Sequence, residues 1–305
     1  MHIPSPIPPA PPDFRSGFIA LVGRPNVGKS TLLNALVGQK IAITSPTAQT
    51  TRNRLQGILT LDRAQIILVD TPGIHKPHHL LGEVLVKNAI AAINAVDLVI
   101  WLVDSSVELG GGDRFVAELL QKTQVPTILG LNKIDQVQGE IDPSYQTYID
   151  PLGWSAIPFS ALTGQGIGQL QQQCCTHLPP GPYYYPPDQI TDQPERFIMG
   201  ELIREQILLL TREEIPHAVA VTIDQVEEQA KLTKIMATIH VERSSQKGII
   251  IGKQGQMLKQ IGTAARLQIQ KLILGSVHLE IFVKVQPKWR SSRFQLADLG
   301  YRLEN

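Results

Sequence analysis

The chain has few aromatic residues, only two cysteines, almost no net charge and no long apolar run. Aromatic side chains make up 5% of its 305 residues, so we expect hydrophobic cores built from aliphatic side chains. Cys174 and Cys175 are adjacent, and this spacing suits neither a disulfide between the two nor a shared metal site. We therefore expect a reduced protein in the cytoplasm.

No stretch of the sequence has the length of a membrane-spanning helix, which takes about 18 or more consecutive apolar residues. The segment Met1–Pro12 contains six prolines and lacks the charged start and apolar centre of a secretion signal. We interpret residues 1–15 as a disordered extension of polyproline character. The net charge of +1 gives no sign of a polyanionic partner for the chain as a whole.

The length of the chain suits two domains. In residues 16–178, apolar β-rich runs alternate with helical patterns, which predicts an α/β domain with a mostly parallel sheet. Its expected strands are Phe18–Val22, Leu55–Leu61, Gln65–Val69, Leu98–Val103, Pro126–Leu131 and Ala156–Phe159. Its expected helices are Lys29–Val37, Gly82–Ala95, Gly112–Thr123 and Gly166–His177.

Residues 179–192 are predicted to be a linker between the domains. Five prolines fall within Leu178–Pro187, and such a stretch continues neither a helix nor a sheet. The three tyrosines of this segment either stack on RNA or pack against a domain face, and we favour packing.

Residues 193–305 are predicted to form a second, α+β domain. The elements follow the order α-β-β-α-α-β, which suits a compact sheet with helices on one face. The expected helices are Phe197–Leu210, Gln256–Leu274 and Arg293–Leu299, and the expected strands are Ala218–Ile223, Leu232–Val241 and Val277–Val285.

A complete phosphate-binding motif, G-x-x-x-x-G-K-S, lies between the first predicted strand and the first predicted helix. Glycines let backbone N–H groups wrap a phosphate, and the helix N-terminus adds partial positive charge. We expect Lys29 to reach the terminal phosphates and Ser30 to bind Mg²⁺. The alternative, a glycine-containing turn with a surface lysine, leaves the other matching positions unexplained. The predicted phosphate-binding residues here are Gly23, Arg24, Pro25, Asn26, Val27, Gly28, Lys29, Ser30 and Thr31.

A second phosphate-side motif, Asp70-Thr71-Pro72-Gly73, follows the strand that ends at Val69. An aspartate at this place holds Mg²⁺ through a water molecule opposite Ser30. The N–H group of Gly73 is expected to contact a γ-phosphate, and all four residues are predicted to line the phosphate site. By itself the motif is also a common turn, but its place after a strand favours a nucleotide site.

The polar loop Gln39–Asn53 is predicted to respond to the γ-phosphate. We expect Thr51, rather than Thr50, to supply a second side-chain contact to Mg²⁺. The alternative is a surface loop rich in serine and threonine. Hydrolysis is then predicted to depend on Lys29, Thr51 and Gly73.

A base-recognition motif, Asn132-Lys133-Ile134-Asp135, follows the strand Pro126–Leu131. The carboxylate of Asp135 is placed to accept hydrogen bonds from N1–H and the exocyclic amine of guanine, a pattern that adenine does not offer. Asn132 is expected to brace the loop and approach N7, and the stem of Lys133 to cover the base. A helix-capping turn is the alternative. Backbone N–H groups of Ser160 and Ala161 are weaker candidates for contact with guanine O6.

Ras-type enzymes orient the attacking water with a glutamine just after D-x-x-G, but in this sequence that position is Ile74. His75 is a candidate base, although a loop histidine more often faces solvent. The hypotheses that remain are backbone groups or another residue of the loops. A monovalent cation such as K⁺ near Asn26 is a third hypothesis, which the resemblance to cation-dependent GTPases with asparagine at this position implies. His75, His78 and His79 lack carboxylate partners and are not expected to bind a metal.

In the second domain, Gly252-Lys253-Gln254-Gly255 forms a G-x-x-G motif between an isoleucine run and a helix. The motif is similar to the loop with which KH domains clamp a single-stranded nucleic-acid backbone. Gly252, Lys253, Gln254, Gly255, Lys247 and Lys259 are the predicted RNA-binding residues. Ile249–Ile251 and Leu279–Val283 are expected to be core. Val241–Arg290 contains nine basic and two acidic residues, a net charge of 9 − 2 = +7, which favours nucleic-acid binding over an ordinary solvated surface.

Together these segments resemble the Era family of GTPases. The likeness rests on G-R-P-N-V-G-K-S-T-L-L-N-A-L-V-G, A-Q-T-T-R-N-R, V-D-T-P-G-I, L-N-K-I-D and the C-terminal segment, and it runs from about Gly17 to Tyr301. It implies a P-loop NTPase of Ras-like G-domain fold followed by an α+β type II KH domain. It also implies GTP and GDP as ligands, Mg²⁺ as cofactor, and the 3′ end of small-subunit ribosomal RNA in the 30S subunit as target.

Members of the resembled family also associate peripherally with the inner face of the cell membrane, although no basic amphipathic helix in this sequence adds to that expectation. We expect a monomer. The favoured function is a GTP-driven RNA switch, and the alternative is a KH-type RNA-binding protein in which GTP is a slow structural cofactor. The base-recognition motif and the second domain argue against a metabolic P-loop kinase.

Overall fold

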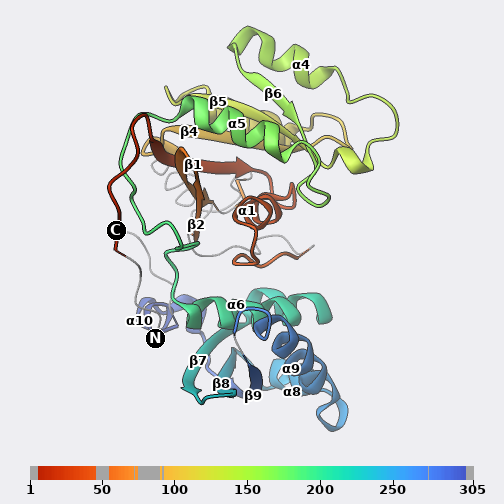
Figure 1. Cartoon of the computed structure of the whole chain (residues 1–305). Helices are drawn as coiled ribbons and strands as arrows, with labels where there is room; N and C mark the ends of the chain where they lie inside the picture. Colours follow the sequence, from red (N-terminus) through yellow and green to blue (C-terminus); the bar gives the residue numbers. More distant parts are fainter. Residues whose placement is uncertain are drawn as a thin grey trace. The chain divides into compact units, whose positions relative to one another are not determined.

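The computed structural model describes residues 6–45, 55–71, 73–74, 90, 93–273 and 275–299. It divides into two compact units, which are described separately. The first comprises Met1–Ala42 and Ala48–Asp192, and the second Ile43–Thr47 and Gln193–Asn305 (Figure 1). Residues 179–192, predicted to be the linker, fall in the first unit, and Ile43–Thr47, predicted to belong to the first domain, falls in the second.

The first unit is built on a six-stranded sheet in the order β2-β3-β1-β4-β5-β6. Strand β2 is antiparallel to β3, and all other neighbours are parallel, as the alternating pattern predicts. The strands are β1 (Arg15–Gly23), β2 (Leu55–Leu61), β3 (Ala64–Asp70), β4 (Leu98–Asp104), β5 (Thr127–Asn132) and β6 (Ser155–Pro158). The helices are α1 (Lys29–Val37), α3 (Gly111–Leu120), α4 (Ser144–Ile149) and α5 (Ile167–His177), with 3-10 turns at Ile134–Gln136 and Asp150–Leu152.

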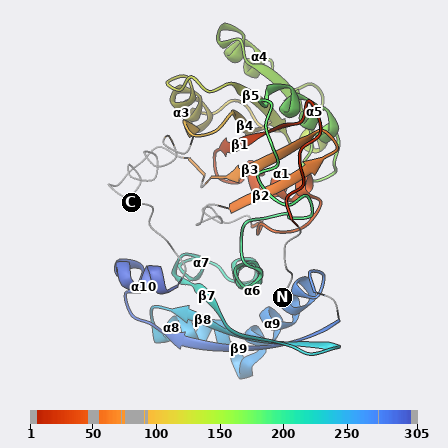
Figure 2. The same ribbon diagram turned by 60° about the vertical axis from the view of Figure 1, so that its left-hand side comes forward.

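Helices cover both faces of this sheet, which is why its central strands are continuous apolar runs. On one face, Trp101 and its neighbours on β1, β4 and β5 pack against α3 and α4. Helices α1 and α5 lie on the other side (Figure 2). Strand β1 has β3 on one side and β4 on the other, so the loop that follows β1 opens at the point where the strand order reverses. Ligands of open α/β sheets bind at such a point.

The proline-rich linker lies along the first unit. Gly181 N donates to Phe14 O, and Ile58 N donates to Ile190 O. The Tyr183 and Tyr184 rings pack on Phe14 and Phe18, with centroid distances of 4.2 and 5.3 Å, in line with the predicted packing against a domain face.

The predicted disorder of residues 1–15 needs correction at its C-terminal end. Phe14 is buried and β1 begins at Arg15. Packing against the linker explains the difference, because an apolar ring at the end of a proline-rich stretch has a partner there.

The second unit has a three-stranded sheet, β7-β8-β9, in which β8 is antiparallel to β7 and parallel to β9. Helices α6 and α9 pack against each other and on this sheet. The strands are β7 (Ala220–Glu228), β8 (Leu232–Val241) and β9 (Ser276–Val285). The helices are α6 (Glu195–Leu210), α7 (Ile215–Ala218), α8 (Ser244–Ile251), α9 (Gln256–Ile269) and α10 (Arg293–Asp298), with 3-10 turns at Lys253–Gly255 and Trp289–Ser291.

The structure contains the predicted order α-β-β-α-α-β, with α8, for which no range was predicted, as the first of the two adjacent helices and with the short α7 in addition. Several bounds also differ. The helix expected to reach Leu274 ends at Ile269, because the buried positions Ile261, Ala265 and Ile269 of its apolar face end there. Strand β7 continues through polar residues to Glu228, since they pair with β8 across a bulge. Most of the helix expected at 82–95 lies outside the described residues.

Two segments expected to be core are partly exposed. The isoleucine run belongs to α8, where Ile250 is buried but Ile249 is 51% exposed, because successive helical positions point in different directions. In β9, Phe282 is 53% exposed on the face of the strand opposite its half-buried neighbours Ile281 and Val283. None of the helices in the described part of the chain is long and apolar enough to cross a membrane.

Candidate functional site

The phosphate-binding motif forms the turn between β1 and the N-terminus of α1. Gly28, the residue before the helix, has φ 100°, a left-handed conformation that favours glycine. A Cβ atom at Gly28 would also collide with the side-chain amide of Asn132. The backbone of this loop and the base-recognition motif are therefore packed together.

Lys29 is nearly buried at the start of α1, with 7% of its surface exposed. Its Nζ donates to the carbonyl oxygens of Gly23, at 3.1 Å, and Arg24, at 2.8 Å, so the amine lies over the loop. Burial lowers the pKa of Lys29 to about 8, although the carboxylate of Asp70 acts in the opposite direction. An anionic phosphate beside this amine would favour its charged form.

The two side chains predicted to hold magnesium lie together. Ser30 Oγ donates to Asp70 Oδ2 at 2.9 Å, and Asp70 is fully buried at the end of β3. A hydroxyl and a carboxylate are the hard oxygen ligands that Mg²⁺ prefers. These residues fit the cofactor that the sequence implies.

The loop after Asp70 packs closely on the phosphate-binding loop. Thr71 Oγ1 donates to Leu21 O at 2.8 Å, and Ile74 N donates to Gly23 O at 3.1 Å. A Cβ atom at Gly73 would lie 2.8 Å from Pro25 N, so only glycine fits against the loop. Gly73 thus lies against the phosphate-binding loop, and its contact with a γ-phosphate stays a prediction.

Ile74 is 3% exposed and belongs to the hydrophobic core beside β1 and α3. Its side chain is apolar and buried, which agrees with the expectation that it cannot orient water. Thr51, Pro72 and the three histidines at 75, 78 and 79 lie outside the described residues. Within the described part of the chain, no group of histidine, cysteine and carboxylate side chains has the arrangement of a metal site.

Asn132 connects the phosphate-binding loop to the loop after β6. Its Nδ2 donates to Val27 O at 2.8 Å, and its Oδ1 accepts from Ala161 N at 2.9 Å. The bracing role expected of Asn132 is therefore present. The Ser160 N–H donates to Gln165 O, so contact of Ser160 and Ala161 with guanine O6 stays a prediction.

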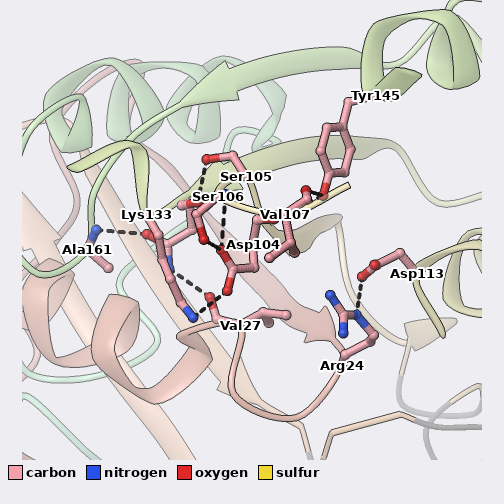
Figure 3. Close-up of polar contacts among 11 residues, drawn as sticks. Arg24, Val27, Asp104, Ser105, Ser106, Val107, Asp113, Lys133, Tyr145 and Ala161 are labelled. Atoms are coloured by element: carbon pink, nitrogen blue, oxygen red, sulfur yellow. Dashed lines mark hydrogen bonds and ion pairs between the residues drawn. The ribbon is translucent and has the colours of Figure 1, made fainter. Parts of the chain in front are cut away.

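Lys133 and Asp135 lie at the rim of the site. Lys133 has φ 68°, and its Nζ lies 2.6 Å from Asp104 Oδ2 at the end of β4 (Figure 3). Burial alone would raise the pKa of Asp104, but hydrogen bonds from Lys133 and Ser106 outweigh it and hold the pKa below its usual value. Asp135 is exposed in the following 3-10 turn, where its carboxylate is open to a ligand.

Two supporting residues escaped the sequence analysis. Asp113, fully buried in the first turn of α3, accepts from Arg24 Nε at 2.6 Å, so the Arg24 side chain joins the loop to α3 (Figure 3). Tyr145 donates its hydroxyl to the carbonyl oxygens of Asp104 and Val107, both at 2.9 Å. No local sequence pattern indicates these contacts, because the residues that form them are 38 to 89 positions apart in the sequence.

In the second unit the G-x-x-G motif joins α8 to α9. Gly252 has φ 72°, and a Cβ atom there would lie 2.6 Å from Met257 Cβ. Gly255 has φ 77° with open space around it. Lys253 and Gln254 are exposed at the tip between two helix ends, an arrangement that lets a phosphate backbone approach closely.

The predicted basic residues near this loop are accessible. Lys259 is exposed on α9 and Lys247 is half-buried on α8. The described structure thus brings the phosphate and base motifs together in the first unit and forms a separate loop of the KH type in the second.

Comparison with known protein families gives one match in each of the two units. The family described as "50S ribosome-binding GTPase" matches residues 18–133, and the family described as "KH domain" matches residues 214–290. The curated GTPase Era of Nostoc sp. (strain PCC 7120 / SAG 25.82 / UTEX 2576) is 66% identical over 301 residues, which are 98% of this chain and 93% of the relative.

Two solved structures are similar over nearly the whole chain. One is Era in complex with MgGDPNP and nucleotides 1506–1542 of 16S ribosomal RNA, with a TM-score of 0.88 and 36% identity. The other is an Aquifex aeolicus Era variant bound to GDP and AlF4⁻, with a TM-score of 0.87 and 36% identity. Each covers 95% of this chain and 100% of its own.

Proposed function

Because the chain belongs to the Era family of GTPases, we propose that it is a GTP-driven switch that binds the 3′ end of small-subunit ribosomal RNA during assembly of that subunit. The chain is a GTPase, an enzyme that hydrolyses GTP to GDP and phosphate. The main observation behind the proposal is the phosphate-binding site, where the Ser30 hydroxyl donates a hydrogen bond to the Asp70 carboxylate beside the buried amine of Lys29.

The phosphate chemistry follows from these groups. Lys29 and the N–H groups at the start of α1 stabilise negative charge that develops on the phosphates. Ser30 and Asp70 would hold Mg²⁺, which would neutralise charge on the phosphates. Gly73 N–H meets the γ-phosphate, and Thr51 adds a contact from the preceding loop. Loss of the γ-phosphate on hydrolysis releases both loops.

The guanine specificity is assigned to Asp135, with Asn132 bracing the two loops around the base. The exposed carboxylate of Asp135 and the αL backbone of Lys133 support this assignment. Asp104 holds the Lys133 amine and so fixes the stem that covers the base.

The RNA assignment rests on the loop Gly252–Gly255 and the basic residues around it. The similar Era structure contains a fragment of 16S ribosomal RNA, which supports the same class of target for this chain. We propose the 30S subunit as the partner of a monomeric protein and, from the resemblance to the family alone, peripheral contact at the inner face of the cell membrane. Co-sedimentation with 30S subunits and with vesicles of anionic lipid tests these two contacts separately.

A monovalent cation near Asn26 is our proposal for orienting the attacking water. The burial of Ile74 supports it, because this position offers no polar side chain. Asn26 lies in the phosphate-binding loop with φ 65°. Hydrolysis is expected to be faster in KCl than in NaCl at equal ionic strength, and equal rates would contradict the proposal.

The central experiment compares RNA affinity in two nucleotide states. An RNA with the sequence of nucleotides 1506–1542 of 16S ribosomal RNA is expected to bind more tightly with GDPNP than with GDP. Crosslinking and sequencing of RNA bound in the GDPNP state identifies the bases contacted. Lys29→Ala is expected to abolish hydrolysis while weak RNA binding persists. Equal RNA affinities in both states would contradict the switch and favour GTP as a slow structural cofactor.

A further inference from the structure

Helix α6 carries three consecutive polar residues that are almost fully buried. Arg204 and Glu205 are each 1% exposed, and Gln206 is 8% exposed. Burying a charged side chain is costly unless hydrogen bonds or an opposite charge compensate it. Each of these residues therefore needs a structural reason for its place in an otherwise apolar stretch of helix.

The reasons differ for the two charges. Arg204 forms two hydrogen bonds with the carboxylate of Glu201 on the same helix, both 2.7 Å long. Glu205 Oε1 accepts instead from Thr44, from its backbone N at 2.7 Å and from its Oγ1 at 3.3 Å. Glu205 Oε2 accepts from Gln206 Nε2 at 3.3 Å. One partner of this buried carboxylate is thus 161 residues away in sequence.

Thr44 lies in Ile43–Thr47, which belongs to the second unit. The residues just before it are held in the first unit, where Asn34 of α1 accepts from Ile41 N and Ala42 N and donates to Ala42 O. After α1, the chain is therefore held by Asn34 at Ile41 and Ala42, and then by Glu205 of α6 at Thr44. Thr44 therefore lies in the same predicted loop, Gln39–Asn53, as the proposed γ-phosphate sensor Thr51.

The other end of that loop is also attached to a segment that leads into α6. At the start of β2, Gln56 O accepts from Thr191 Oγ1 at 2.7 Å, and Ile58 N donates to Ile190 O at 2.8 Å. Thr191 is four residues before α6 begins. Both flanks of the nucleotide-responsive loop are thus connected, by hydrogen bonds and chain, to the same helix.

We propose that Glu205 is the positioning residue through which the state of the loop after α1 acts on RNA binding. This inference rests on the proposed GTP switch. A loop ordered by the γ-phosphate shifts Thr44, and a buried carboxylate cannot lose that partner without cost. Helix α6 then follows, and α6 packs on α9, whose N-terminus carries the G-x-x-G loop.

The test measures coupling rather than affinity. The ratio of RNA affinities with GDPNP and with GDP is determined for the unaltered protein and for Glu205→Leu, which keeps volume but removes the acceptor. We expect the ratio to fall by about fivefold or more towards one. The factor by which RNA strengthens GDPNP binding should fall equally, because coupling is reciprocal. Glu205→Gln retains an acceptor and should keep most of the coupling.

Glu201→Gln is the matched control, because it alters a carboxylate on the same helix that does not contact Thr44. Glu201→Gln should leave the ratio of RNA affinities unchanged within about twofold. An equal fall of this ratio in both variants would mean that Glu205 supports the helix in general and has no specific role in coupling. Thr44→Val removes only the weaker, 3.3 Å bond and should have a small effect.

Amide hydrogen exchange in the unaltered protein tests the same point even where Glu205→Leu fails to fold. The Thr44 amide, which donates to Glu205, is expected to exchange at different rates with GDPNP and with GDP. Equal rates, or an unchanged affinity ratio in a folded Glu205→Leu, would overturn the inference. A ratio of one in the unaltered protein would instead overturn the switch itself, so the two failures are distinguishable.

Discussion

At the scale of single residues, one exposed carboxylate is assigned the choice of base. Asp135 is predicted to accept two hydrogen bonds from guanine, while Asn132 holds the surrounding loops in place. Asp135→Asn should weaken GTP binding by about 100-fold or more, because each hydrogen bond to a charged group contributes about 1.5–3 kcal/mol. Xanthosine triphosphate should gain affinity, since the new amide donates to its O2.

Competition binding with GTP, xanthosine triphosphate and ATP measures this exchange of preference. Asp135→Ala is the control, because it loses the acceptor without gaining a donor and should bind neither purine well. A variant Asp135→Asn that still prefers GTP would contradict the assignment of base recognition to this residue.

Lys29 makes nucleotide binding depend on pH. Its pKa of about 8 in the folded protein lies below the ordinary 10.5, since burial disfavours the charged amine. Phosphate should restore the charge, so nucleotide binding takes up protons once the pH reaches the pKa of the free amine. GDP affinity should then fall as the pH rises through about 8.

Calorimetry of GDP binding in buffers of different ionisation enthalpy counts these protons. Lys29→Arg is the control, because a guanidinium stays charged throughout this range and should remove the proton uptake. Proton release on binding would contradict this account.

The same pKa shift determines how the stability of the protein depends on pH. The free-energy cost of burying the charged amine is fully present below pH 8 and is relieved as the pH rises towards 10.5.

At the scale of elements, the G-x-x-G loop of the second unit needs a residue without a side chain at position 252. Gly252→Ala places a Cβ atom 2.6 Å from Met257 Cβ at φ 72°, and should destabilise this unit by more than about 1 kcal/mol and weaken RNA binding. Gly248→Ala, inside α8 with nothing within 4 Å, should instead stabilise it by about 0.5–1 kcal/mol. Thermal unfolding and RNA titration of both variants compare them, and equal effects would contradict the role of Gly252.

The elements that the sequence predicted best are those whose whole residue pattern lies in one continuous segment. The strand, the phosphate-binding loop and α1 lie in one segment, so their pattern and their chemistry can be seen together. The six residues of α4 carry too little apolar periodicity to be recognised. The strand β7 extends through polar residues because its ladder with β8, rather than its own pattern, defines its length.

The parts of the site that the sequence did not reveal are pairs between distant residues. Asp113 reaches Arg24, Asp104 reaches Lys133 and Glu205 reaches Thr44 only after the chain has folded. Each is an acidic side chain that looks like an ordinary surface charge on its own. The burial of Asp113 and Glu205 marks them as structural, and burial is a property of the fold rather than of a local motif.

At the scale of the whole molecule, the linker is part of the first unit rather than a free spacer. Gln65, fully buried on β3, accepts from Tyr184 N at 2.8 Å and Tyr185 N at 3.0 Å, and donates to Tyr185 O at 2.9 Å. The proline content predicted a stiff connection, but only the fold shows that a single glutamine holds it. The stretch between this anchored linker and α6 is thereby shortened to the few residues that follow Thr191.

Gln65→Leu should release this linker, because three backbone groups lose their side-chain partner and regain hydrogen bonds only in water. The first unit should lose about 2 kcal/mol of stability, and chymotrypsin should cleave much faster after Tyr183 and Tyr184. Tyr185→Phe removes only the bond to Gln56 and should leave cleavage nearly unchanged. A linker cut at the same rate in Gln65→Leu as in the unaltered protein would mean that the prolines and ring contacts hold it without Gln65, and that the glutamine is a local feature of β3.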